Sequence, residues 1–302
     1  MSSPITAPDN LAGKTLLLTG AGRGIGRALA RHLAAEGAAL VVNDLDADLL
    51  DTLVTEIAGE GGRALAAPGS VSDPAVADGL VATAVNHFGG LDGLVNNAGV
   101  HYESTPWKED PARARQLVEV NVLGTLYCGM AALRYFIGQR RGSLVNVTSG
   151  AHLGVAGQAT YAASKGAVAS LTYAWALDAR PYNVRVNAVA PLARTRMTDA
   201  LAAYKPTGGN TASGVVVPEP DALAPLFGYL LADRSAAVTG QILRFNGREL
   251  SLISHPVIGA VRYGRDHWDI AAVEEVIAGA MKATLSPVGL GASHYQGPSG
   301  SP

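Results

Sequence analysis

Short apolar runs alternate with longer stretches of helical spacing along most of the chain. The apolar runs are rich in Leu, Val and Ala, as buried strands are, and the stretches between them repeat apolar residues about every three or four positions. Alternating strands and helices predict an α/β fold: a single doubly wound parallel sheet, Rossmann-like, of about seven strands, with helices on both faces. The predicted strands span residues 14–19, 38–44, 63–67, 91–95, 142–149, 184–190 and 241–245.

Start and stop residues mark the helix boundaries. The helix that begins near Ala47 is expected to end at Gly61-Gly62, and Asp73-Pro74 is a typical start for the next one. Further helices are predicted over residues 112–137 and 221–232. The boundaries therefore agree with the alternation of strands and helices.

The domain organisation follows from where this regular pattern stops. Residues 1–250 are predicted to form one Rossmann-like domain, within which the Gly- and Pro-rich stretch from 194 to 220 is typical of a lid or binding loop. Residues 251–290 form a C-terminal extension that we expect to cover the pocket or a subunit contact. Residues 291–302 have the composition of a disordered tail.

Composition and charge exclude several classes of function. The net charge of −2 provides no basic surface for nucleic acid or an anionic membrane. The single cysteine, Cys128, excludes an intramolecular disulfide and is compatible with a reducing compartment. We see no signal-peptide pattern and no membrane span, so a cytoplasmic protein is expected. His, Cys and acidic residues show no metal-ligand spacing, which predicts no catalytic metal.

A glycine-rich turn joins the first strand to the first helix. Gly20, Gly24 and Gly26 form a G-x-x-x-G-x-G pattern that includes Arg23 and Ile25. Such a turn lets the backbone approach a pyrophosphate at a helix N-terminus, where free N–H groups and the helix dipole favour an anion. The more familiar G-x-G-x-x-G spacing is not met, because position 25 is Ile. The turn predicts a dinucleotide site.

An acid at the end of the second strand bears on the choice of dinucleotide. Asp44 lies 18 positions after Gly26, where such folds place the acid that binds a ribose 2′-hydroxyl and repels a 2′-phosphate. This favours NAD over NADP, whereas Arg23 argues weakly for NADP. The alternative role for Asp44 is a helix cap, for which Asp46 and Asp48 also compete.

The strongest chemical signal is a tyrosine and a lysine four positions apart. On a helix, Tyr161 and Lys165 project from one face, and Ser149 lies shortly upstream. A fixed ammonium charge favours the phenolate and is expected to lower the tyrosine pKa toward that of a general acid/base, while Ser149 holds a carbonyl or alcohol oxygen. The alternative is a half-buried helix aromatic beside a solvated lysine.

These motifs, in this order, resemble those of the short-chain dehydrogenase/reductase family over about residues 13–247. The resemblance implies that Tyr161 is the acid/base, that Lys165 lowers its pKa and binds the nicotinamide ribose, and that Ser149 orients the substrate oxygen. Asn121, placed in the middle of a helix, would hold a water that relays protons. The other cofactor residues implied are Ser70, Val71, Asn97, Ala98, Gly99, Pro191 and Thr195.

The chain departs from the family pattern in three places. Ser149 precedes Tyr161 by 12 positions rather than the common 13, where Thr148 lies; we retain Ser149 because it ends the strand. Leu192 replaces the glycine of the usual Pro-Gly after the sixth strand, and Thr195, the counterpart of the threonine that binds the nicotinamide amide, lies one position early. Ser70 replaces the acid that often contacts adenine, which weakens that assignment.

The resemblance implies an NAD(P)-dependent oxidoreductase, with NAD favoured, that interconverts a secondary alcohol and a ketone, and a homodimer or homotetramer by analogy. Residues 41–44 and 190–198 are also similar to hydroxyacyl-CoA dehydrogenase units of multifunctional β-oxidation enzymes, which makes a 3-hydroxyacyl thioester a candidate substrate. A non-catalytic dinucleotide sensor or scaffold, and an epimerase or dehydratase that retains its cofactor, are the alternatives from other classes.

Substrate contacts are expected from residues that follow the strand ends. His152 lies three positions after Ser149, although a plain loop histidine is an equal interpretation. The loop from Met197 to Val217 is a further candidate. The individual substrate-site candidates are His101, Tyr102, His152 and Leu153.

Overall fold

A single sheet dominates the computed structural model, which describes residues 11–194, 217–256, 258–259 and 262–282. Its order is β3-β2-β1-β4-β5-β6-β7-β8. The first seven strands are parallel, and β8 is antiparallel to β7. The strands are β1 Thr15–Thr19, β2 Ala39–Asn43, β3 Arg63–Ala66, β4 Gly93–Asn96, β5 Gly142–Val147, β6 Val184–Pro191, β7 Ile242–Phe245 and β8 Leu250–Ile253.

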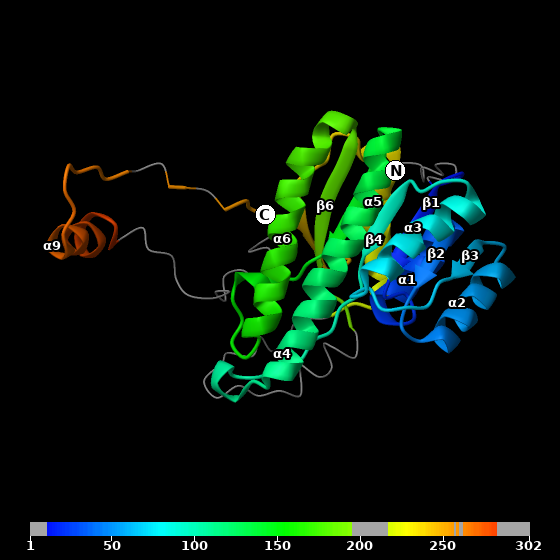
Figure 1. The fold of residues 1–302 in the computed structure, drawn as a ribbon, viewed down its shortest axis with the longest axis horizontal. Coiled ribbons are helices and arrows are strands. Elements are labelled where there is room, and N and C mark those ends of the chain that lie inside the picture. The colour runs from blue at the N-terminus through cyan, green and yellow to red at the C-terminus, as the bar shows by residue number, and fades with distance from the viewer. Residues whose placement is uncertain (1–10, 195–216, 257, 260–261, 283–302) are drawn as a thin grey trace, which may run out of the picture. The chain divides into compact units, whose positions relative to one another are not determined.

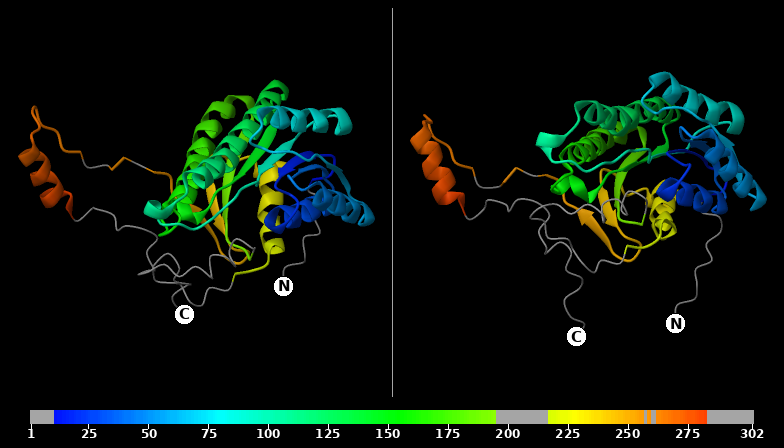
Figure 2. Two further views of the ribbon diagram at one scale, coloured as in Figure 1. Left: turned by 60° about the horizontal axis from the view of Figure 1, so that its bottom comes forward. Right: turned by 90° about the horizontal axis from the view of Figure 1, so that it is seen from below.

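Helices cover both faces of this sheet. In Figures 1 and 2, α3, α5 and α6 lie on one face, and α1, α2 and α8 lie on the other. The doubly wound architecture expected from the sequence is therefore confirmed. The helices are α1 Gly24–Ala35, α2 Ala47–Gly59, α3 Pro74–Phe88, α4 Pro111–Val118, α5 Thr125–Gln139, α6 Ala159–Ala179, α8 Ala224–Leu231 and α9 Ile270–Glu274.

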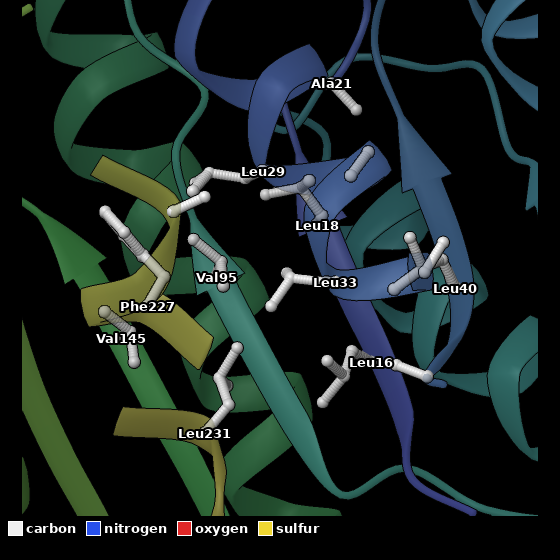
Figure 3. Close-up of a cluster of buried hydrophobic side chains, with 14 of the residues drawn as sticks. Leu16, Leu18, Ala21, Leu29, Leu33, Leu40, Val95, Val145, Phe227 and Leu231 are labelled. Atoms are coloured by element: carbon white, nitrogen blue, oxygen red, sulfur yellow. The ribbon is translucent and has the colours of Figure 1, made fainter. Parts of the chain in front are cut away.

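Two hydrophobic cores, one on each face, account for this arrangement. Successive strand residues point to opposite faces, so Leu16 and Leu18 of β1 join the core beneath α1 and α8, while Leu17 joins the core beneath α3 and α5. Figure 3 shows the first core, where Leu33 and Phe227 meet the strand side chains. Each fully buried side chain of this size contributes roughly 1.5–3 kcal/mol, so both faces need their helices.

Two features differ from the sequence-based expectation. An eighth strand, Leu250–Ile253, extends the sheet with residues at the boundary of the predicted extension; its sequence LSLI alternates apolar and polar positions too briefly to stand out. The long predicted helix is interrupted by a π-helical segment, Glu119–Gly124, between α4 and α5. The continuous stretch Pro111–Gln139 is long and apolar enough to cross a membrane, yet half of its most apolar window is buried within the protein.

The contacts divide the chain into two compact units, the first ending at Ile253 and the second beginning at Ser254. In the second unit, Asp269 caps α9 by accepting a hydrogen bond from the backbone N–H of Ala272 at 2.8 Å. A π-helical segment, Glu275–Ala280, continues that helix. The expected role of residues 251–290 stays a prediction, and the predicted tail, 291–302, lies outside the described residues.

Candidate active site

A cleft of about 490 Å³ opens at the carboxyl ends of the parallel strands. The strand order reverses between β1 and β4, and such switch points are where open α/β sheets bind ligands. Thr195 and residues 197–216 lie outside the described residues. The cleft is lined by every other predicted cofactor residue: Gly20, Arg23, Gly24, Ile25, Gly26, Asp44, Ser70, Val71, Asn97, Ala98, Gly99, Tyr161, Lys165 and Pro191.

The glycine turn is held in a shape that only glycines permit. Gly20 and Gly24 have φ values of 66° and 55°, in the left-handed region. A Cβ on Gly26 would lie 2.0 Å from the carbonyl oxygen of Gly20. The Asn97 side-chain amide donates hydrogen bonds to the carbonyls of Thr19 and Gly20 at 3.0 and 2.9 Å. Asn97 therefore supports the turn.

The N-terminus of α1 fits a phosphate group. Arg23 is the N-cap residue of α1, and its side chain makes no capping hydrogen bond to the first turn of the helix. That turn contains no acidic residue. Its backbone N–H groups are therefore not capped by a described side chain, and the helix dipole adds partial positive charge there. Because Gly26 and Gly20 leave no side chain above the turn, the residues present fit the pyrophosphate of a dinucleotide.

Asp44 faces this turn and does not cap α2. Its carboxylate accepts a hydrogen bond from the Gly22 N–H at 2.9 Å. Asp46 is the residue that caps α2, by accepting from the N–H of Leu49 at 3.3 Å. Asp46 also forms an ion pair with Arg23 at 3.0 Å. The helix-cap alternative for Asp44 therefore does not hold.

Tyr161 and Ser149 are brought together across the loop between β5 and α6. Tyr161 is only 8% exposed, and its side chain is hydrogen-bonded to that of Ser149. Burial raises the pKa of Tyr161 to about 12, and the hydrogen bond from Ser149 opposes this rise. The hydroxyl of the neighbouring Thr148 is engaged elsewhere, because it donates to the backbone carbonyl of Lys165 at 2.8 Å. The choice of Ser149 over Thr148 agrees with this geometry.

Lys165 is buried one helical turn beyond Tyr161. Its exposed fraction is 4%, its Nζ donates to the carbonyl of Val147 at 2.8 Å, and Nζ lies 5.8 Å from the centre of the Tyr161 ring. Burial lowers the pKa of Lys165 to about 8. The solvated-lysine alternative is therefore wrong. The expected lowering of the Tyr161 pKa is not observed either, because burial of the phenol outweighs other influences.

We expect the buried lysine to make stability depend on pH. Between about pH 8 and 10.5 the unfolded chain binds more protons at Lys165 than the folded protein, so the lysine's contribution is fully present above pH 10.5 and is lost as pH falls through about 8. Urea unfolding at about pH 8 and pH 10.5 measures this effect. The free energy of unfolding of wild type, relative to that of Lys165→Met, should be greater at the higher pH. Tyr161 is present in both proteins, so its own contribution cancels in this difference. Parallel pH dependences would contradict the buried ammonium.

Asn121 lies in the π-helical segment and clamps the loop after β4. Its side chain accepts a hydrogen bond from the Val100 N–H at 2.8 Å and donates to the Val100 carbonyl at 2.9 Å. It also donates to the hydroxyl of Ser164 at 3.2 Å. π-Helical turns are rare and often occur at functional sites. Here the turn places a fully buried amide between the cleft loop and α6.

The predicted substrate residues are only partly gathered at the cleft. His101 lines it, whereas Tyr102, His152 and Leu153 do not. The Tyr102 hydroxyl donates to Glu109 at 2.5 Å, and the Arg113 guanidinium lies over its ring. The His152 ring contacts the carbonyl of Ser149, so it closes the local turn, as the plain loop histidine alternative has it.

Several cleft residues carry no sequence signal of their own. Gln158 is 5% exposed and lines the cleft beside Tyr161, three positions before it, a spacing that could have drawn attention to it. Most of the others lie at or just after the ends of strands, and Val120 lies in the π-helical segment. The additional lining residues are Asn43, Leu45, Gly69, Val100, Val120, Val147, Thr148, Gln158, Leu192 and Ala193.

Comparisons with known proteins identify the family of the chain. Residues 14–205 match the family model for short chain dehydrogenase. The chain is 35% identical over 239 residues, 76% of its length and 94% of the relative's, to (2S)-[(R)-hydroxy(phenyl)methyl]succinyl-CoA dehydrogenase subunit BbsD of Thauera aromatica. It is 35% identical over 266 residues, 83% of each chain, to hydroxyacyl-CoA dehydrogenase ChsB1 of Mycobacterium tuberculosis. A crystal structure of a short chain dehydrogenase from Mycobacterium avium has a TM-score of 0.81 at 32% identity, covering 92% of this chain and 97% of that one.

A parallel sheet with a glycine-lined cleft at its switch point and a buried tyrosine–lysine pair defines a dinucleotide-dependent oxidoreductase. With the matches above, the chain belongs to the short chain dehydrogenase family. It is an NAD(P)-dependent oxidoreductase that acts on CH–OH groups. The resemblance predicted from the sequence, including that to hydroxyacyl-CoA dehydrogenases, is confirmed.

Proposed function

We propose that Tyr161 is the general acid/base in reversible oxidation of a secondary alcohol to a ketone with NAD. The observation that carries this proposal is the buried hydrogen bond between Tyr161 and Ser149, one helical turn from buried Lys165, in the glycine-lined cleft. In the direction of oxidation, secondary alcohol and NAD⁺ give ketone, NADH and a proton. Bound NAD supplies the hydride acceptor.

The protein's own residues handle the oxygen and the proton. The two hydroxyls of Tyr161 and Ser149 bind the substrate oxygen between them, and the phenolate form of Tyr161 removes the hydroxyl proton. Lys165 holds its ammonium close to the phenol ring through its bond to the Val147 carbonyl. In reduction, the Tyr161 hydroxyl returns the proton to the developing alkoxide.

The role of Asn121 is narrower than binding a water through its side chain. Both polar atoms of its amide are engaged with Val100, and its backbone carbonyl accepts a hydrogen bond from the Thr125 hydroxyl at 2.8 Å. We infer that Asn121 fixes the loop carrying Val100 against α6 and thereby shapes the nicotinamide end of the cleft. A proton relay at Asn121 would have to use its backbone carbonyl.

The choice of NAD over NADP rests on charge. Asp44 lines the cleft at the end of β2, where its carboxylate repels a 2′-phosphate, and Arg23 is held by Asp46 in an ion pair. The argument for NADP was that Arg23 could pair with a 2′-phosphate, and its ion pair with Asp46 weakens that argument. We accordingly propose NAD as the working cofactor.

We predict that Asp44→Ala shifts cofactor preference toward NADP. Removing the carboxylate eliminates the repulsion of a 2′-phosphate and one ribose contact, so the ratio of kcat/KM for NAD to that for NADP should fall by about 10-fold or more, as expected for one charge-assisted interaction. Asp48→Ala, an exposed acid in the first turn of α2, is the matched control and should keep the wild-type ratio. Preference for NADP by the wild-type enzyme would overturn the assignment.

A second candidate is a 3-hydroxyacyl thioester as the substrate. Two relatives carry names of dehydrogenases of CoA thioesters, one from Thauera aromatica and one from Mycobacterium tuberculosis. A panel of secondary alcohols, ketones and 3-oxoacyl thioesters, assayed with both cofactors by nicotinamide absorbance, tests the activity and ranks the substrates. No change of cofactor with any of them would contradict the proposed function. We retain a homo-oligomeric, cytoplasmic enzyme as a proposal by analogy.

A further inference from the structure

A buried polar relay lies beside Tyr161. His101 and Glu103 have side chains only 4% and 10% exposed, and His101 Nε2 lies 3.7 Å from Glu103 Oε1. His101 is also hydrogen-bonded to the side chain of Gln158. Its ring packs edge-on against the Tyr161 ring, with centroids 4.5 Å apart. The relay therefore runs from Glu103 through His101 to Gln158, in contact with the proposed acid/base.

Backbone contacts hold the two halves of this relay together. The N–H of Ser104 donates to the carbonyl of Gly157 at 2.9 Å, and Ser104 and Gln158 form a parallel β-bridge. The loop after β4, which carries His101 and Glu103, is thereby tied to the loop that begins α6. The relay is a fixed feature of the cleft wall.

The relay is incomplete within the protein. In the described part of the chain, Glu103 Oε1 is buried without a hydrogen-bond partner, and 3.7 Å to His101 exceeds hydrogen-bond length. Buried polar groups normally find partners. His101 and Gln158 are the members of the relay that line the cleft, so a ligand in the cleft can form a hydrogen bond with the Gln158 end.

The end of the relay is a hydrogen-bond donor. A glutamine amide has two N–H bonds and one carbonyl, so one bond with His101 leaves Gln158 at least one N–H in either protonation state of the imidazole. Gln158 lies one helical turn before Tyr161, whereas Lys165 lies one turn after it. Because Gln158 lines the cleft beside Tyr161, its remaining N–H is available to a ligand bound there.

The surrounding charge favours a neutral oxygen over an anion. Burial, aided by the charge of Lys165, lowers the pKa of His101 against the opposing effects of Glu103 and Gln158, so the imidazole is neutral at neutral pH. Among the described lining residues the positive charges are Arg23, paired with Asp46, and Lys165, bound to Val147. A substrate carboxylate at Gln158 would meet no counter-charge there and would lie near Glu103.

We propose that Gln158, oriented by His101 and Glu103, binds an acyl carbonyl oxygen adjacent to the reacting carbon and so selects ketones that carry a neutral acyl group over simple ketones. This rests on the proposed function and deepens it. Gln158 contacts the substrate, while His101 and Glu103 are positioning residues. The substrate class is therefore 3-oxoacyl esters or thioesters and the corresponding 3-hydroxy compounds.

The test compares two ketones that differ at one group. Ethyl 3-oxobutanoate carries the acyl carbonyl, and 4-ethoxybutan-2-one has a methylene in its place. Wild type should prefer the ester in kcat/KM, and Gln158→Leu should lower kcat/KM for the ester by about 10- to 100-fold more than for the ether ketone, as the loss of a designed hydrogen bond implies. Gln158 makes no side-chain cap for α6, so the substitution leaves the helix start intact.

Controls separate binding from folding. Gln116→Leu, the same change on the exposed face of α4, should keep the wild-type ratio for the two ketones. The double variant His101→Leu/Glu103→Gln, which leaves no buried unpaired carboxylate, should raise KM for the ester with a smaller effect on kcat. His101→Gln, which retains a polar partner for Gln158, should recover part of the preference.

Equal losses for both ketones in Gln158→Leu would overturn the proposal, as would a wild-type enzyme that prefers 3-oxobutanoate to its ethyl ester, because that result indicates an anion site. Failure of the proposed function has a different signature. In that case wild type would oxidise no reduced cofactor with either ketone, including 4-ethoxybutan-2-one, whose reduction needs no second oxygen.

Discussion

Replacing Tyr161 with Phe is expected to lower kcat by at least about 10³-fold, within the range for loss of a positioned acid/base. The phenyl ring fills the same buried space and keeps its edge contact with His101, while the hydroxyl that transfers the proton is lost. Steady-state rates with NAD and a secondary alcohol, or NADH and a ketone, measure this loss. The Kd for NADH should change less than about threefold, because the glycine turn is untouched.

Tyr182→Phe is the matched control for this substitution. Tyr182 is 37% exposed and does not line the cleft, so its hydroxyl has no place in the proposed chemistry. The control should therefore retain the wild-type rate. A Tyr161→Phe enzyme with the wild-type rate would refute the assigned role, whereas a variant that also lost NADH binding would indicate damage to the fold.

The second large effect is expected at the glycine turn. A methyl group on Gly26 would lie 2.0 Å from the Gly20 carbonyl oxygen, far inside contact distance, so Gly26→Ala must push the turn open. The backbone N–H groups of α1 would then no longer point at one anion, and the Kd for NADH should rise by about 100-fold or more, corresponding to nearly 3 kcal/mol. Fluorescence titration with NADH measures the change.

Gly79→Ala provides the same substitution at a harmless place. Gly79 lies in α3, and a Cβ there has no atom within 4 Å. Alanine should raise the stability of that helix by roughly 0.5–1 kcal/mol and leave the Kd unchanged. Near wild-type NADH affinity in Gly26→Ala would mean that the turn does not hold the dinucleotide.

The sequence allowed much of the fold to be predicted because its strands are buried on both faces. Continuous runs such as Leu16–Leu18 and Leu40–Val42 can be recognised without any structure, and alternation with helices then determines the sheet type. The last strand, Leu250–Ile253, was missed because its side chains are mostly exposed at the sheet edge. The π-helical segment around Asn121 was missed because one wider turn within a long helix barely disturbs the spacing of apolar residues.

The site was predictable where residue type and spacing carry the chemistry. The glycines, Asp44, Ser149, Tyr161 and Lys165 could be placed at one sheet edge from order alone. Tertiary contacts decided the rest. Tyr102 and His152 follow strand ends as expected, yet Glu109 binds one and the Ser149 carbonyl contacts the other, so neither lines the cleft.

The pKa values show why local spacing was an incomplete guide to chemistry. A lysine one turn from a tyrosine was expected to lower the pKa of the phenol. In the folded chain, burial raises the pKa of Tyr161 to about 12 and lowers that of Lys165 to about 8. The degree of burial depends on loops distant in sequence, including the segment that carries His101. Spacing identified the pair, and packing determined its titration.

Isotope transfer tests the central assignment most directly. With NADH deuterated at the transferable position of the nicotinamide and ethyl 3-oxobutanoate as the ketone, mass spectrometry of the product reports where the label goes. The arrangement of Tyr161, Ser149 and Lys165 beside the glycine-lined cleft predicts one deuterium on the new carbinol carbon, with the hydroxyl proton coming from solvent. Product without deuterium at that carbon, or no product at all, would contradict hydride transfer in this cleft.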